Sequence, residues 1–101
     1  MRVAISTDGK YVSPHFGRCT TYTLVDVVNG KTVKREEVNN PGHSPGVIPR
    51  FLHDKGVNII VCGGMGVRAA GLFDELGIKM ITRVDGSIDE VILKFNQSIV
   101  K

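Results

Sequence analysis

An Asn29-Gly30 pair stands between two strand-like segments, and it constrains the fold more than any other feature. Residues 20–28 (TTYTLVDVV) are rich in β-branched and aromatic side chains, and residues 31–38 (KTVKREEV) begin with strand-like alternation. Asn-Gly between two such runs is typical of a two-residue turn, because both residues adopt positive φ at low cost. The two segments are therefore predicted to form an antiparallel hairpin.

Helices and strands alternate along the rest of the chain. Apolar periodicity and glycine or proline stops define each of these elements. In chain order they are a strand at 2–6, a helix from about 48 to a glycine at 56, a strand at 57–62, a helix at 67–76, a strand at 78–82 and a helix at 88–99. Ser87 and Glu90 form a capping box that opens the last helix. The predicted order is β-β-β-α-β-α-β-α.

The hairpin also fixes the directions of the strands, which are numbered here along the sequence. Strand 2 must be antiparallel to strands 1 and 3, and two βαβ crossovers then add strands 4 and 5. If strand 4 lies beside strand 1, the result is an α/β fold with a five-stranded mixed sheet of order 3-2-1-4-5 and helices on both faces. The length of 101 residues and the 42% hydrophobic content predict a single domain over residues 1–101.

Composition limits the partners that we expect. The net charge of +3 is mild and the basic residues do not cluster, so no nucleic-acid partner is expected. No signal peptide is recognisable, and the longest apolar run (NIIVCGGMG) is too short to cross a bilayer. We therefore expect a cytoplasmic protein without a membrane partner. The charges of residues 31–38 discourage pairing at the outer strand, which favours a monomer.

The loops that follow the parallel strands are expected to meet at one edge of the sheet. Open α/β sheets bind ligands at this edge, where successive connections diverge to opposite faces, here between strands 1 and 4. The four loops are residues 7–18, 39–46, 63–66 and 84–86. We expect them to form one rim.

Most of the residues capable of ligand chemistry fall in or beside these loops. His15, Arg18 and Cys19 belong to the first loop and its end, His43 to the second, and Cys62 ends strand 4. Imidazole and thiolate ligands favour zinc, copper or iron–sulfur species. Glycines at a helix N-terminus leave backbone amides open to an anion. Together these groups suit an anionic ligand that contains a metal.

Plainer explanations stay open for each of these residues. His15 could cap a turn, His43 could be solvated, and both cysteines could be small buried residues that make no disulfide. Arg18 could pair with a carboxylate such as Asp8. The glycines could serve only a tight strand-to-helix turn. His53, within a predicted helix, is interpreted as structural or exposed.

A second motif supports an alternative function. Residues 64–69 (GMGVRA) match G-x-G-x-x-A between a predicted strand and a predicted helix, which is the local context of a dinucleotide fingerprint. The chain begins with a hairpin instead of a βαβ unit, and it has no P-loop. The alternative is therefore a small nucleotide- or anion-binding module. A purely structural interaction domain is a third possibility.

The stretches that carry a resemblance to a known family are RVAISTDG, VSPHFGRC and VNIIVCGGMGVRAAGLFDELGIKMI. The chain resembles the dinitrogenase iron–molybdenum cofactor biosynthesis family over nearly its whole length. The resemblance implies a three-layer, ribonuclease-H-like fold without nuclease activity. It also implies a non-enzymatic domain that binds or carries an iron–sulfur or iron–molybdenum–sulfur cluster, or its precursor. Such a carrier has donor and acceptor proteins as partners and no permanent cofactor, as in nitrogenase cofactor biosynthesis.

The resemblance also suggests roles for particular residues. The residues that match the SPHFGR motif and the glycine turn of the family are His15, Arg18, Gly63, Gly64 and Gly66. By this analogy His15 ligates an exposed iron, with Cys19 or His43 as further metal ligands. Arg18 and the amides of the glycine turn offset the charge of the cluster through charge-assisted hydrogen bonds.

Overall fold

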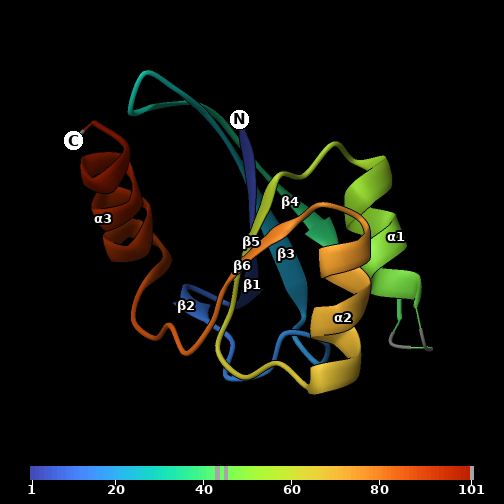
Figure 1. The fold of residues 1–101 in the computed structure, drawn as a ribbon. Helices are drawn as coiled ribbons and strands as arrows, with labels where there is room; N and C mark the ends of the chain where they lie inside the picture. Colours follow the sequence, from blue (N-terminus) through green and yellow to red (C-terminus); the bar gives the residue numbers. More distant parts are fainter. Residues whose placement is uncertain (43, 45, 101) are drawn as a thin grey trace.

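A computed structural model describes residues 1–42, 44 and 46–100, with side chains as far as residue 97. The described chain forms β1 (Arg2–Asp8), β2 (Tyr11–Val12), β3 (Thr21–Val28), β4 (Lys31–Asn39), α1 (Val47–Asp54), β5 (Ile59–Val61), α2 (Val67–Glu75), β6 (Lys79–Ile81) and α3 (Ile88–Val100). The strands make one mixed sheet, with helices on both of its faces (Figure 1). The predicted α/β class, mixed sheet and three helices are confirmed for the described residues.

The sheet has six strands, so the prediction of five is wrong. Its order is β4-β3-β1-β5-β6, and β2 pairs with β1 off this path. β3 is antiparallel to both β1 and β4, whereas β5 is parallel to β1 and to β6. The unpredicted strand, β2, has two residues, of which only Val12 is buried. Two residues are too few to show a strand period in the sequence.

The hairpin between β3 and β4 forms as predicted. Asn29 has a φ of 52° and Gly30 a φ of 75°, so both turn residues occupy the left-handed region. A type I′ turn requires this, and its twist matches that of the flanking strands. The register shifts once, between Asp26 and Val27, and the strands otherwise pair from Thr21 opposite Asn39 to Val28 opposite Lys31.

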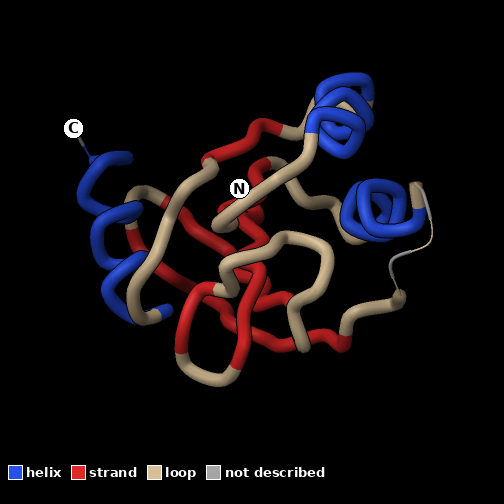
Figure 2. The backbone as a smooth tube through the Cα atoms, turned by 90° about the horizontal axis from the view of Figure 1, so that it is seen from below, coloured by secondary structure: helices blue, strands red, loops and turns tan. Residues whose placement is uncertain are grey.

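The sheet separates two apolar clusters, and β1 contributes to both. Ala4 belongs to the cluster beneath α1 and α2, while Val3 and Ile5 belong to the cluster beneath α3. Alternate side chains of a strand point to opposite faces, which explains this division. Figure 2 shows the same layers from below, with α3 on one side of the strands and the other two helices on the opposite side.

α3 opens at the predicted cap. The Ser87 hydroxyl oxygen accepts the Glu90 amide at 3.2 Å and lies 3.3 Å from the Glu90 carboxylate. This satisfies an amide that the first helical turn leaves without an intrahelical partner. In the part of the chain that the structure describes, no helix is long and apolar enough to cross a membrane.

α1 and α2 lie side by side and run in the same direction. Both begin at the end of the molecule where β1 and β5 finish, as Figure 1 shows. This follows from the parallel crossovers, since each helix runs back antiparallel to the strands that it connects. Two helix N-termini therefore flank the edge of the sheet at which a ligand site was expected.

Candidate functional site

A pocket of about 610 Å³ opens at this edge of the sheet. Three chain segments line it: residues 15–18, Ser44 with Gly46 and the first turn of α1, and the glycine bend with the first half of α2. These are the loops expected after β1, β4 and β5, and they do share one rim. The pocket lies between α1 and α2 and opens to solvent.

The fourth expected loop lies beside the others but does not line this pocket, so three of the four expected loops border it. The Val12 amide donates to Gly86 O at 3.0 Å, which holds the loop against β2. Val84 and Asp85 line a separate pocket on the side of α3. The fourth loop therefore stays bonded to its neighbours, since the Val84 amide also donates to Cys62 O at 3.0 Å, but it lies on their α3 side.

His15 is fixed directly beside the glycine bend. Gly64 N donates to Pro14 O at 2.7 Å, and Phe16 N donates to Gly64 O at 3.0 Å. These two bonds form a parallel bridge that pairs His15 with Gly64. The His15 side chain is exposed and lines the pocket. The expected proximity of the histidine and the diglycine bend is confirmed.

Gly63 makes this contact between the loops possible. A Cβ at Gly63 would lie 2.7 Å from the carbonyl oxygens of Ser13 and Pro14, closer than side-chain atoms pack. Gly63 is itself buried, and its carbonyl accepts the Arg83 amide at 2.7 Å. Gly63 thus determines the spacing of the loops, whereas Gly64 and Gly66 line the pocket.

Both helix N-termini at the pocket lack a capping side chain. The N-cap residues are Gly46 for α1 and Gly66 for α2, and neither helix has an acidic residue in its first turn. The first amides of a helix have no intrahelical acceptor and carry partial positive charge. At α1 the Val47 amide already donates to Ser44 O at 3.1 Å and Pro49 has no amide hydrogen. The N-terminus of α2 is therefore the better anion site.

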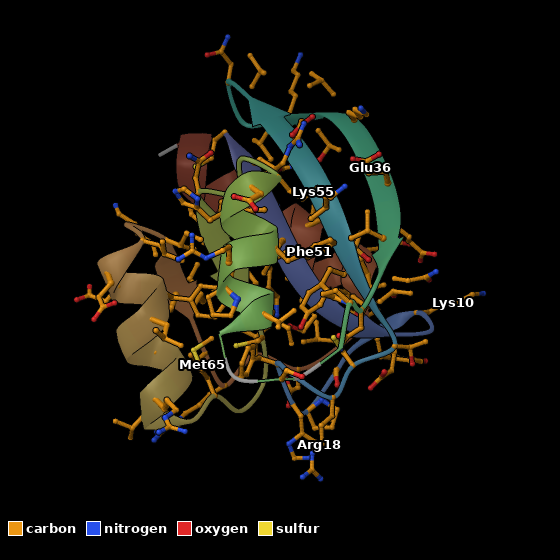
Figure 3. All side chains as sticks on the ribbon, turned by 90° about the vertical axis from the view of Figure 1, so that its right-hand side faces the viewer. Lys10, Arg18, Glu36, Phe51, Lys55 and Met65 are labelled. Carbon is orange, nitrogen blue, oxygen red and sulfur yellow. The ribbon has the colours of Figure 1, made fainter. Side chains whose placement is uncertain are left out.

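Two arginines add positive charge to the rim. Arg18 and Arg68 both line the pocket and are exposed. Figure 3 shows Arg18 reaching outward from its loop at this end of the molecule. Arg18 makes no ion pair with any residue of the described ranges. Asp8 instead accepts the amide and hydroxyl of Thr20 at 2.8 and 2.9 Å, so Arg18 is available for an anionic ligand.

Neither cysteine lines the pocket. Cys19 is 4% exposed and donates its thiol to Phe16 O at 3.4 Å, while Cys62 is fully buried in the same core cluster. Burial raises the pKa of both thiols, that of Cys62 to about 11, so both are protonated at neutral pH. A protonated thiol is a poor metal ligand. The predicted ligand role of Cys19 therefore has no support from its position.

Of the two other histidines, the structure describes His53, which does not line the pocket. His43 lies outside the described residues. His53 is exposed on α1, with Nδ1 3.7 Å from the Asp54 carboxylate, away from the residues that line the pocket. Across residues 1–42, 44 and 46–100, no group of three or more His, Cys, Asp or Glu residues is placed to hold a metal ion.

The sequence patterns did not single out Met65 and Arg68, which both line the pocket. Met65 is half-buried within the glycine bend, and its thioether is a soft ligand type. Arg68 is the second residue of α2. Its position in GMGVRA, two residues after a glycine N-cap, could have indicated a cation beside an anion site.

The fold and the pocket define a class: a small α/β domain with an open pocket, lined by two arginines, at the carboxyl edge of its sheet. Comparison with known families makes this more specific. The chain belongs to the family described as dinitrogenase iron-molybdenum cofactor, whose model matches residues 1–98. The resemblance seen in the sequence is thereby confirmed.

Individual relatives cover almost the full length of the chain. The uncharacterized protein MJ0580 of Methanocaldococcus jannaschii is 34% identical over 100 residues, which cover 94% of this chain and 85% of that protein. The crystal structure of PH0822 matches with a TM-score of 0.92 and 37% identity over 97% of this chain and 90% of that one. The apo form of the orange protein from Desulfovibrio gigas matches with a TM-score of 0.82 and 23% identity, over 99% and 90% of the two chains. At that identity the last match shows the fold alone.

Proposed function

We propose that this chain is a non-enzymatic domain that binds and carries an iron–sulfur or iron–molybdenum–sulfur cluster, or its precursor, between donor and acceptor proteins. The observation that carries the proposal is the fixed position of His15 beside Gly64, in a pocket bordered by two helix N-termini. Membership in an iron–molybdenum cofactor family supports the type of cargo. The layered α/β architecture supports the ribonuclease-H-like assignment implied by the resemblance.

The donor set of the pocket favours an intact cluster over a bare metal ion. The described lining residues provide one imidazole, from His15, and one thioether, from Met65. A bare zinc ion takes three or four protein ligands, which is more than this set contains. A preassembled cluster brings its own sulfide ligands and its negative charge. One exposed iron can then bind the His15 imidazole while the protein balances the remaining charge.

That charge balance comes from three sources at the rim. Arg18 and Arg68 are positioned to donate charge-assisted hydrogen bonds to sulfide or oxo groups. The uncapped N-terminus of α2 lies at the same pocket, because Gly66 and Arg68 line it. Because His15 and Arg18 are exposed, the cargo stays accessible to a partner, as reversible delivery requires.

Anaerobic loading tests the proposal. Incubation with iron, sulfide and molybdate should give a charge-transfer absorption that His15→Ala reduces at least several-fold. His53→Ala is the matched control, because it removes an exposed histidine away from the pocket, and it should load like the unaltered chain. Equal absorption in the His15→Ala and His53→Ala variants would remove His15 from the site.

One observation favours a second candidate, a nucleotide- or anion-binding module. The GMGVRA segment joins β5 to α2 with Gly66 as the N-cap, which is the local arrangement that binds phosphates. ATP or NAD should then raise the melting temperature. Gly64→Val should abolish that rise, because even a Cβ at this position would lie 3.2 Å from Pro14 O. If neither nucleotide protects the chain, this candidate has no support.

A further inference from the structure

The carbonyl oxygen of Phe16 receives three hydrogen bonds from the core below the pocket. The donors are the Tyr22 hydroxyl at 2.6 Å, the Ser6 hydroxyl at 3.3 Å and the Cys19 thiol at 3.4 Å. All three donor side chains are buried, with at most 4% exposure. A carbonyl oxygen has only two lone pairs, so three buried donors on one oxygen exceed what it needs to be satisfied. We call Phe16 O and its three donors the Phe16 carbonyl cluster.

The rest of Phe16 is equally restrained. Its amide donates to Gly64 O at 3.0 Å, within the bridge to the glycine bend. Its ring packs edge-to-face on Phe73 of α2, with ring centroids 5.8 Å apart and an interplanar angle of 77°. Amide, carbonyl and ring are thus each held by a different part of the structure. The residue before Phe16 is His15, so these restraints also fix the backbone that carries the imidazole.

We propose that Tyr22 and Cys19 are positioning residues, which hold the Phe16 peptide and thereby preorganise His15 for the cargo. In this role Cys19 acts as a hydrogen-bond donor and not as a metal ligand. The inference rests on the proposed carrier function. Its physical basis is that a ligand held in its bound geometry loses less conformational freedom on binding, which increases affinity.

The position of the Cys19 sulfur supports this assignment. Sγ donates to a backbone carbonyl inside the core, and the side-chain nitrogen of Asn40 lies 3.9 Å from Sγ. Asn40 also donates to the backbone carbonyls of Gly17 and Cys19, at 3.1 and 2.8 Å. The loop between β2 and β3 is therefore held from β3 and from the segment after β4. To ligate cargo in the pocket, the thiol would have to break this arrangement.

Four variants separate positioning from ligation. Tyr22→Phe removes only a hydroxyl group, and Cys19→Ala removes the thiol donor. Cys19→Ser keeps a small donor but replaces the soft sulfur ligand. Cys62→Ala is the matched control, since it removes a buried thiol from the same core cluster without touching the Phe16 carbonyl.

Two measurements are made on each variant. Amide hydrogen exchange without cargo follows Phe16 and Gly64, with the Ala4 amide of β1 as the reference for global unfolding. Anaerobic titration with iron, sulfide and molybdate follows the charge-transfer absorption. Tyr22→Phe and Cys19→Ala should accelerate exchange at Phe16 and Gly64 about tenfold relative to Ala4, and weaken loading by a similar factor. Cys19→Ser and Cys62→Ala should stay close to the unaltered chain in both measurements.

Three results would overturn the inference. The first is that Cys19→Ser loses loading as fully as Cys19→Ala, while amide exchange at Phe16 in Cys19→Ser stays unchanged. That result would make the sulfur a ligand of the cargo. Exchange could rise equally at Phe16 and Ala4, which would make the cluster a general stabiliser of the core. Tyr22→Phe could load like the unaltered chain. If the unaltered chain itself fails to load, the carrier function is wrong, and that result is distinguishable from the other three.

Discussion

At the scale of single residues, the close approach of Gly63 to the loop before His15 determines where the pocket can form. We predict that Gly63→Ala lowers the free energy of unfolding by about 1–3 kcal/mol, because the new Cβ meets two backbone oxygens that cannot move independently. The urea midpoint measures this change. Loading of the cargo at His15 should fall as well, since the loop that carries His15 must shift to make room for the new Cβ.

Gly71 provides the matched control for this substitution. It lies within α2, and a Cβ there meets no atom within 4 Å. Gly71→Ala should therefore stabilise the chain by about 0.5–1 kcal/mol, the usual difference between alanine and glycine inside a helix. A loss of stability in Gly71→Ala as large as in Gly63→Ala would show that the contact with Ser13 and Pro14 is not the cause.

The buried Cys62 thiol predicts a dependence of stability on alkaline pH. Burial raises its pKa to about 11 from an ordinary value of 9.0, so the folded chain holds this proton more tightly than the unfolded chain. As pH rises above 9.0, the unfolded chain releases the proton first, and the free energy of unfolding falls until the pH passes about 11. At about 1.4 kcal/mol per pKa unit, the full loss in the free energy of unfolding from this thiol is about 3 kcal/mol.

Urea unfolding at neutral and at alkaline pH measures this effect. Cys62→Ala should lose less stability on the change to alkaline pH than the unaltered chain. Part of the loss should remain, because burial also raises the pKa of Tyr22 and Cys19. Identical alkaline losses in the two chains would contradict the assignment to Cys62.

At the scale of elements, the N-terminus of α2 is where stability and cargo binding should respond oppositely to charge. Val67 is the first residue of this helix, lies between Gly66 and Arg68, and is 91% exposed. Val67→Glu should stabilise the helix by about 0.3–1 kcal/mol, because a carboxylate complements the helix dipole. The same charge should weaken the loading of an anionic cargo, and Val67→Lys should reverse both effects.

Thermal unfolding and anaerobic loading at low salt measure the two responses. Val33→Glu is the control, since Val33 is 63% exposed on β4, outside the pocket. It should leave loading unchanged. If Val67→Glu bound the cargo more tightly, the pocket would not be an anion site.

The sequence could predict those elements whose structure depends on the conformational preferences of their own residues. The hairpin follows from Asn29 and Gly30, whose positive φ values are a local property. The cap of α3 follows from Ser87 in the same way. β2 could not be predicted, because its two residues form a strand only through pairing with Thr7 and Asp8 of β1. Tertiary pairing of this kind leaves almost no signal in so short a segment.

At the scale of the whole molecule, topology predicted more of the site than residue chemistry did. Parallel strands must bring their following loops together, which placed His15 beside the glycine bend. The directions of individual side chains do not follow from topology. Cys19 was expected to be a metal ligand, yet it faces the Phe16 carbonyl, and Gly63 spaces the loops without lining the pocket. Met65 and Arg68 reach the pocket only because of how α2 begins.

The central claim is that the pocket beside His15 holds the cargo. The most direct test is an anomalous diffraction map, recorded at the iron absorption edge, from crystals loaded anaerobically with iron, sulfide and molybdate. We expect an iron peak within bonding distance of an imidazole nitrogen of His15, between the N-termini of α1 and α2. An iron peak only in the pocket beside α3, or no ordered iron in a chain that shows the absorption, would contradict it.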